Sequence, residues 1–198
     1  MMTEEHFIFP LGSVLFPGSL LPLRIFEQRY IEMTKLCIRD NRPFGVCLIK
    51  EGTEVGTPAV PQAVGCLATI EEWEMPQLGM FELKARGTQR FRLLDSRVAT
   101  NGLITAQVER IDADTPAQFV DGACREVLKL IVDRVGAANF PQPIELDDAS
   151  WVGYRLAEVL PLEPHVKQSL LELTDSSARL DQLRDILVSE GLVVSDRS

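Results

Sequence analysis

Apolar and polar residues alternate in parts of the N-terminal half of the chain, which is the pattern of strands with one buried face. The clearest alternation lies at 81–86, where three apolar residues alternate with three charged ones. Side chains two residues apart lie on the same face of a strand, so this segment has one apolar and one polar face. A second alternating segment follows at 90–93. The sequence therefore predicts a hairpin whose turn spans 86–89.

Short apolar runs bounded by turn residues predict further strands. A single helix is expected near 27–40. A small closed or half-closed barrel of about six strands would bury the apolar faces and hide the strand edges. The remaining strands are expected at 7–9, 21–25, 44–49, 63–70 and 104–108.

The period becomes helical after residue 112. Thr115 followed by Pro116 and then Gln118 has the pattern of a helix start. Prolines and glycines divide the rest of the chain into three more helices, at about 148–160, from 164, and from 176 or 177. The stripe of apolar residues that predicts the first of the four helices is Val120, Cys124, Val127, Ile131 and Val135.

These patterns together predict an α+β protein with two subdomains. Residues 1–114 would form the six-stranded barrel with its one helix, and residues 115–198 would form a compact four-helix bundle.

Charge restricts the possible partners. The chain of 198 residues carries 29 acidic and 20 basic side chains, a net charge of −9, which disfavours nucleic acid and anionic membranes. The N-terminus is acidic where a signal peptide is basic, and no apolar run approaches the ~18 residues of a membrane helix. The four cysteines lack metal or redox spacing, which favours buried free thiols and a cytoplasmic location.

The sequence carries no complete set of catalytic residues. It has no GxxxxGK[ST] phosphate loop, and its five lysines all lie in polar or amphipathic segments. Neither His6 nor His165 has a carboxylate or cysteine at ligand spacing, and the acidic run at 71–74 is interpreted as a solvated strand end. We therefore predict no enzymatic activity, no cofactor and no metal site.

The segment 9–30 (FPLGSVLFPGSLLPLRIFEQRY) holds three prolines and two glycines in an apolar run. Proline limits such a run to short extended pieces, which would follow the edge of the barrel. Its apolar content exceeds what a thin edge must bury, and exposed apolar loops often bind protein. The alternative is that the loop packs against the helical half. The predicted protein-binding surface consists of Phe16, Pro17, Leu20, Gln28, Arg29 and Glu32.

This segment also resembles the start of the Lon protease N-terminal domain family. The resemblance rests on FPL-x-x-V-x-FPG-x-x-LPL-x-IFE-x-RY. It continues in order through VGCLATI (64–70), GTQRFR (87–92), LAEVLPL (156–162) and KQSLLE (167–172), over nearly the whole chain. It implies a PUA-like β-barrel followed by a helical bundle, and the recognition of substrate proteins. In full-length Lon an ATPase and a peptidase domain follow, and this chain carries neither motif.

We therefore expect a non-catalytic module that binds unfolded or extended protein segments, with an auxiliary subunit of an ATP-dependent protease as an alternative. An RNA-binding or small-molecule-binding barrel is a further alternative. The strongest support for RNA binding is a basic face on the predicted hairpin. The simpler interpretation is that these basic residues pair with Glu82 and neighbouring acids. The residues of this basic face are Lys84, Arg86, Arg90 and Arg92.

Trp73 would either be an exposed anchor or close one end of the barrel, and the second is favoured.

Overall fold

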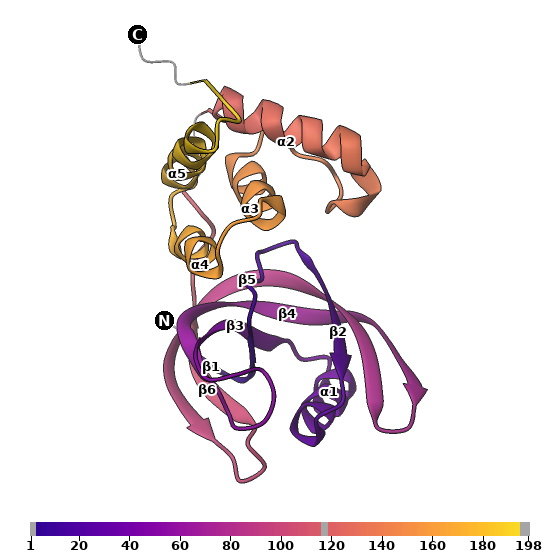
Figure 1. Ribbon diagram of the computed structural model, residues 1–198. Helices are drawn as coiled ribbons and strands as arrows, with labels where there is room; N and C mark the ends of the chain where they lie inside the picture. Colours follow the sequence, from indigo (N-terminus) through magenta and orange to yellow (C-terminus); the bar gives the residue numbers. More distant parts are fainter. Residues whose placement is uncertain (1–2, 116–118, 195–198) are drawn as a thin grey trace. The chain divides into compact units, whose positions relative to one another are not determined.

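The computed structural model describes residues 3–115 and 119–194. The chain divides into two compact units, Met1–Asp112 and Ala113–Ser198 (Figure 1). In its described part, the first unit contains six strands and one helix, and the second contains four α-helices and a short 3-10 helix. The protein therefore has the predicted α+β composition.

One sheet contains all six strands of the first unit, in the order β2-β5-β4-β3-β1-β6. The strands are β1 (Thr3–Leu11), β2 (Leu20–Ile25), β3 (Phe44–Glu51), β4 (Val60–Gln77), β5 (Met80–Val98) and β6 (Ile104–Arg110), and the helix is α1 (Gln28–Asp40).

The sheet closes on itself because β5 also pairs with β6. The N-terminal part of the 19-residue strand β5 lies between β2 and β4, whereas its C-terminal part pairs with β6. Five strands thus form an uneven ring, and β2 lies outside it, attached to β5 alone among the described residues. The predicted six-stranded barrel is confirmed only in this coarser form.

The predicted hairpin turn at 86–89 is wrong. β5 runs without interruption from Met80 to Val98, and the turn lies instead at Gly79, whose φ is 82°. Gly87 suggested a turn in the sequence, but a glycine is needed there for a different reason. A Cβ on Gly87 would lie 2.3 Å from the carbonyl oxygen of Phe16, so only glycine permits this close approach of two backbone segments.

Two apolar clusters fill the first unit. The larger lies between the sheet and α1, where the ring of Phe9 packs on that of Tyr30 with centroids 4.3 Å apart. The smaller draws residues from all five strands of the ring, including Leu67 and Phe91. Both consist of the apolar faces that the alternating pattern predicted.

The four cysteines are buried and form no disulfide, as predicted. Burial raises the pKa of the Cys37 thiol to about 11 and that of Cys124 to about 12, because the thiolate is poorly solvated there. Burial also raises the pKa of Cys47. These thiols are structural side chains of the core.

The second unit begins its helices later than predicted. The first helix starts at Gly122, and Asp121 is its N-cap, with a carboxylate oxygen that accepts from the Cys124 amide at 2.9 Å. Thr115 instead pairs with Asp175 in an isolated bridge, and Pro116 and Gln118 lie outside the described residues. The helices are α2 (Gly122–Val135), α3 (Ala149–Val159), α4 (Pro164–Glu172) and α5 (Ser176–Ser189), with the 3-10 helix Ala137–Asn139 after α2.

The buried stripe of α2 is displaced from the predicted one. Cys124, Leu128 and Val132 are buried, whereas Val135 is exposed. The buried residues of α2 are four positions apart. The predicted residues at 127 and 131 lie beside this stripe and are only partly buried.

A buried arginine organises the second unit. Arg179 on α5 is fully buried and forms an ion pair with Asp114, which is almost fully buried. The Arg179 side chain also donates to the carbonyl oxygens of Leu170 and Leu173 and stacks on the ring of Tyr154. The Tyr154 hydroxyl donates to the same Asp114 carboxylate at 3.1 Å. These contacts connect the start of the unit to three of its helices.

We expect Gly87→Ala to destabilise the protein, because the new methyl group would force the Phe16 backbone away from β5. Overpacking of this kind typically lowers the free energy of unfolding by about 1–3 kcal/mol. Urea denaturation followed by circular dichroism would measure it. Gly122→Ala is the control, since a Cβ there meets no atom within 4 Å. Equal stability of the two variants would contradict the close approach.

Candidate functional site

The predicted binding residues do not form one surface. Phe16 was expected to be exposed but is fully buried. Its loop is held on β5, because the Gly18 amide donates to the Gly87 carbonyl at 2.8 Å and the Gly87 amide donates to the Ser19 carbonyl at 2.9 Å. Pro17, in the same turn, is partly buried, and Leu20 is half-exposed at the start of β2.

Arg29 was also expected on an exposed polar face and is buried instead. Its guanidinium pairs with Glu27 at 3.0 Å, donates to the Gly102 carbonyl at 3.4 Å and lies 4.6 Å above the Tyr30 ring. Helix α1 turns this long side chain inward because its apolar stem covers the core while its charge is neutralised.

The two other predicted helix residues remain at the surface. Gln28 donates to Glu32 at 3.1 Å, and Asn101 donates to the same Glu32 carboxylate at 2.8 Å. Gln28 lines a polar pocket of about 390 Å³ together with Glu27, Arg29 and the turn at 100–102. Leu20 begins the strand β2, which spans about 16 Å at 3.3 Å per residue, and the helix follows the far end of that strand. The predicted set therefore divides between two places.

The structure shows a second candidate at the end of the β4–β5 hairpin, where the sequence offered an exposed Trp73 only as the less favoured alternative. β3 pairs with β4 only as far as Ala68, so within the described ranges the remainder of β4 pairs with β5 alone. Residues 69–86, here called the hairpin end, thus extend past the neighbouring strand. Together with β2 they form a three-stranded sheet in the order β2-β5-β4.

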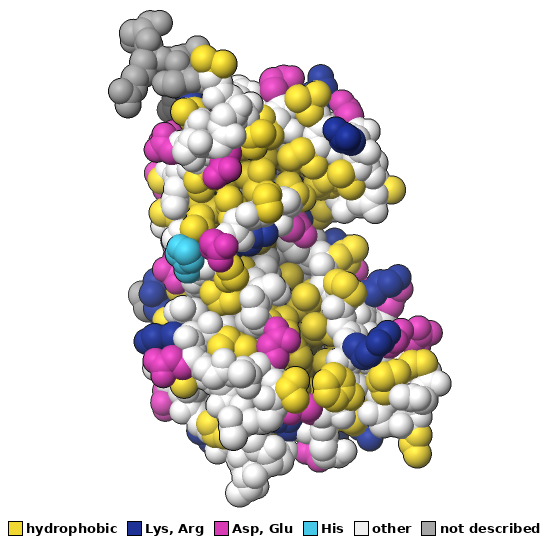
Figure 2. Space-filling model, viewed as in Figure 1, with side chains coloured by type: hydrophobic (Ala, Val, Ile, Leu, Met, Phe, Trp, Pro, Cys, Tyr) yellow, Lys and Arg dark blue, Asp and Glu magenta, His cyan; other side chains and the backbone are white. Residues whose placement is uncertain are grey.

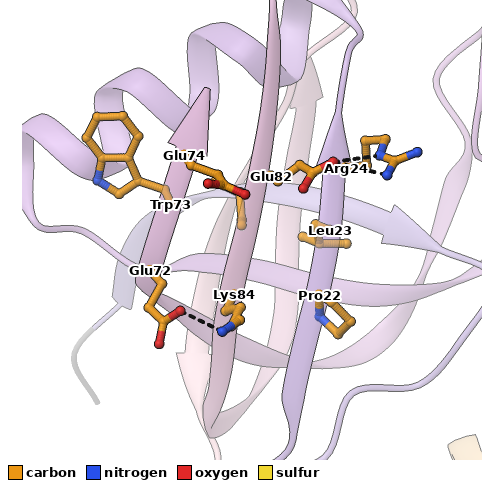
Figure 3. Close-up of a pocket in the computed structure, with 9 residues that line it drawn as sticks. Pro22, Leu23, Arg24, Glu72, Trp73, Glu74, Glu82 and Lys84 are labelled. Carbon is orange, nitrogen blue, oxygen red and sulfur yellow. Dashed lines mark hydrogen bonds and ion pairs between the residues drawn. The ribbon is translucent and has the colours of Figure 1, made fainter. Parts of the chain in front are cut away.

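One face of this sheet, here called the outer face, carries a groove of about 570 Å³ (Figure 3). Charged side chains from all three strands lie on it. Arg24 pairs with Glu82 at 3.0 Å and Lys84 pairs with Glu72 at 2.6 Å. The residues that line the groove are Pro22, Leu23, Arg24, Glu72, Trp73, Glu74, Glu82, Leu83 and Lys84.

Glu74 differs from the other charged residues of the outer face. It lies directly opposite Glu82 in the β4–β5 register, and Figure 3 shows both side chains on this face. Across the described parts of the chain its carboxylate makes no hydrogen bond or ion pair. Its charge does act at a distance, because Glu74 adds to the rise in the pKa of Lys84 that the hydrogen bond to Glu72 mainly causes.

Apolar side chains flank the groove. Trp73 is 50% exposed and packs on Phe81 with ring centroids 5.9 Å apart, and Leu78 at the turn is 97% exposed. Met75 and Phe26 are also exposed, and Phe26 follows the residue of β2 that pairs with Phe81. Figure 2 shows this side of the first unit, where apolar side chains gather beside charged ones.

The prediction that Trp73 closes the barrel is therefore wrong, because the hairpin end projects beyond the strand that would cover its ring. The basic face proposed for RNA does not form either. Arg90 is buried, Lys84 pairs with Glu72, and Arg86 pairs with Glu71 at 2.5 Å. The partners of Lys84 and Arg86 are acids of β4, while Glu82 pairs with Arg24 of β2.

Residues 3–115 and 119–194 contain no group of three His, Cys, Asp or Glu side chains placed to hold a metal ion. Within the same ranges, every helix is too short or too polar to cross a membrane.

Comparison with known proteins decides the family. Residues 5–189 match the family model described as the ATP-dependent protease La (LON) substrate-binding domain. The chain belongs to this family. The crystal structure of a Lon N-terminal domain protein from Xanthomonas campestris is similar to it, with 37% identity and a TM-score of 0.77 over 92% of this chain and 98% of that one. The resemblance inferred from the opening motif is thus confirmed.

More distant members of the Lon family share the fold. The N-terminal domain of a Mycobacterium avium complex Lon protease has a TM-score of 0.69 at 15% identity, over 92% of this chain and 97% of that one. A Lon protease from Methylocella silvestris is 28% identical over 190 residues, which are 89% of this chain and 23% of that protein. The chain therefore spans about a quarter of the length of the curated Lon proteases that it matches.

The Lys84–Glu72 pair gives a direct check of the groove's electrostatics. The hydrogen bond to Glu72 raises the pKa of Lys84, so the charged ammonium is favoured there. In Glu72→Gln the pKa of Lys84 should fall toward its ordinary value, measured from the pH dependence of its Cε chemical shift. Glu126→Gln, on the exposed side of α2, should leave it unchanged. An unaltered pKa in both variants would contradict the pairing.

Proposed function

We propose that this chain is a non-catalytic protein-binding module that holds unfolded or extended segments of other proteins at the hairpin end. The observation that carries the proposal is the exposure of Trp73 and Leu78 on a hairpin that projects past its neighbouring strand. Exposed apolar groups beside charged ones are typical of protein-binding surfaces. The family description, substrate-binding domain, supports the same function.

The energetics suit weak, general binding. A tryptophan offers on the order of 200 Å² of surface for burial. Covering its exposed half would therefore contribute about 2.5 kcal/mol at 25 cal/mol per Å². Association costs more than one such contact supplies, so several anchors must act together. Met75, Leu78, Phe26 and the half-exposed Leu20 provide the others.

The ring of strands is part of this proposal as a PUA-like barrel that serves as a rigid support for the hairpin end. Substrate cleavage belongs to complete Lon proteases, and we assign only binding to these residues. Buried free thiols suit a reducing compartment, which supports a cytoplasmic location.

The test uses a permanently unfolded protein without ATP. Fluorescein-labelled ribonuclease A, reduced and carboxamidomethylated, would be titrated with the chain and followed by fluorescence anisotropy. Binding should be saturable, and Trp73→Ser should weaken it about tenfold, because 1.4 kcal/mol of lost contact is tenfold in Kd. Native ribonuclease A, with its disulfides intact, should not bind.

The matched control is Leu130→Ser, which removes an exposed apolar side chain from α2 in the second unit. It should bind as the unchanged chain does. Circular dichroism must show that both variants are folded. Equal loss of binding in both variants, or none in Trp73→Ser, would exclude the hairpin end as the binding surface.

A further inference from the structure

The charges of the outer face are unevenly neutralised. Three carboxylates, on Glu72, Glu74 and Glu82, share this face with two cations, Arg24 and Lys84. Each cation already has a carboxylate partner, which leaves Glu74 as the unmatched charge. The groove therefore has a net charge of −1 (two positive and three negative groups), on a chain whose net charge is −9.

The position of Glu74 places this excess negative charge at one point of the groove, opposite Glu82. Glu74 lies directly across from Glu82, and like charges at opposed positions of paired strands repel one another. Arg24 lies on the β2 side of Glu82, away from Glu74 (Figure 3). A second cation placed between the two carboxylates would relieve the repulsion, and nothing among the described residues supplies it.

The sheet edge next to the groove is unsuited to strand addition. Because the Gly87 amide bonds to the Ser19 carbonyl, the alternation of an antiparallel ladder turns the backbone groups of Leu20, Pro22 and Arg24 away from β5. Pro22 has no N–H, so the free edge of β2 lacks a donor at its centre. A partner on the β2 side of the groove would therefore lie over the face and its side chains.

We propose that the outer face recognises a lysine or arginine side chain in an extended segment of a partner protein, with its charged group between Glu74 and Glu82. Apolar residues beside that cation would contact Leu78, which is exposed at the turn of the same hairpin. The inference rests on the proposed function and names the chemistry of its partner. Charge complementarity of this kind adds specificity more than affinity.

The experiment compares two labelled peptides that differ at one position. Both are 15-residue peptides with the same aromatic and aliphatic residues, and the central residue is lysine in one and glutamate in the other. Their Kd values would be measured by anisotropy with the full chain at low and at physiological salt. The lysine peptide should bind about fivefold more tightly, a ratio within the range of exposed ion pairs, and salt should reduce the difference.

Two variants locate the effect. Glu74→Gln should bring the ratio of the two Kd values close to one, and Glu74→Lys should reverse the preference. Glu126→Gln changes the net charge equally but lies on α2, so it should keep the ratio of the unchanged chain.

The outcomes separate the two proposals. If both peptides bind without discrimination, or if Glu74→Gln keeps the full preference for lysine, the cation site is wrong while the binding module stands. If neither peptide binds, the proposed function fails and the inference fails with it.

Discussion

Backbone hydrogen bonding along β5 joins three of the other five strands of the first unit. This one strand pairs with β2, β4 and β6, so it both closes the ring and carries the strand that lies outside it. The arrangement depends on a glycine at residue 87, where the loop before β2 meets the backbone of β5. With that loop held down, β2 begins in the register that builds the outer face.

The candidate site follows from a difference in strand length. β4 has 18 residues and β3 has 8, so the end of β4 continues where β3 no longer covers it. Side chains on both faces of this extension are left without a full set of neighbours. Trp73 packs on Phe81 on one face, and Glu74 lacks a cation on the other. Exposed apolar groups and an unmatched charge on one rigid hairpin suit the binding of another chain.

Helices and strands were predicted well from the sequence where the pattern of apolar residues extends over many positions. β2, β3, β6, α1 and the last three helices lie close to their predicted positions, whereas β1 and β4 are longer than predicted and β5 joins two predicted strands. The turn at 86–89 was wrong because a glycine in a strand and a glycine in a turn look alike without the loop that packs on it. The start of α2 was misplaced because Thr115 and Asp121 are both good N-cap residues.

The site could be predicted only in part for the same physical reason. Whether Phe16 or Trp73 is exposed depends on which distant segment covers it, and local composition does not record this. The alternation of Glu82 and Lys84 with apolar residues was visible in the sequence, as was the acidic run at 71–74. Their pairing required the register, which bulges in β4 and β5 shift. Arg29 shows the opposite case. It is a charged residue, but it is buried and forms an ion pair with Glu27, which precedes the first residue of α1.

The most direct test of the account maps the binding surface on the chain itself. Amide chemical shifts of ¹⁵N-labelled chain would be followed by NMR during titration with reduced, carboxamidomethylated ribonuclease A. The account predicts that perturbations concentrate in residues 20–26 and 72–84. Perturbations confined to α2–α5, or spread evenly over the chain, would contradict the assignment of binding to the hairpin end.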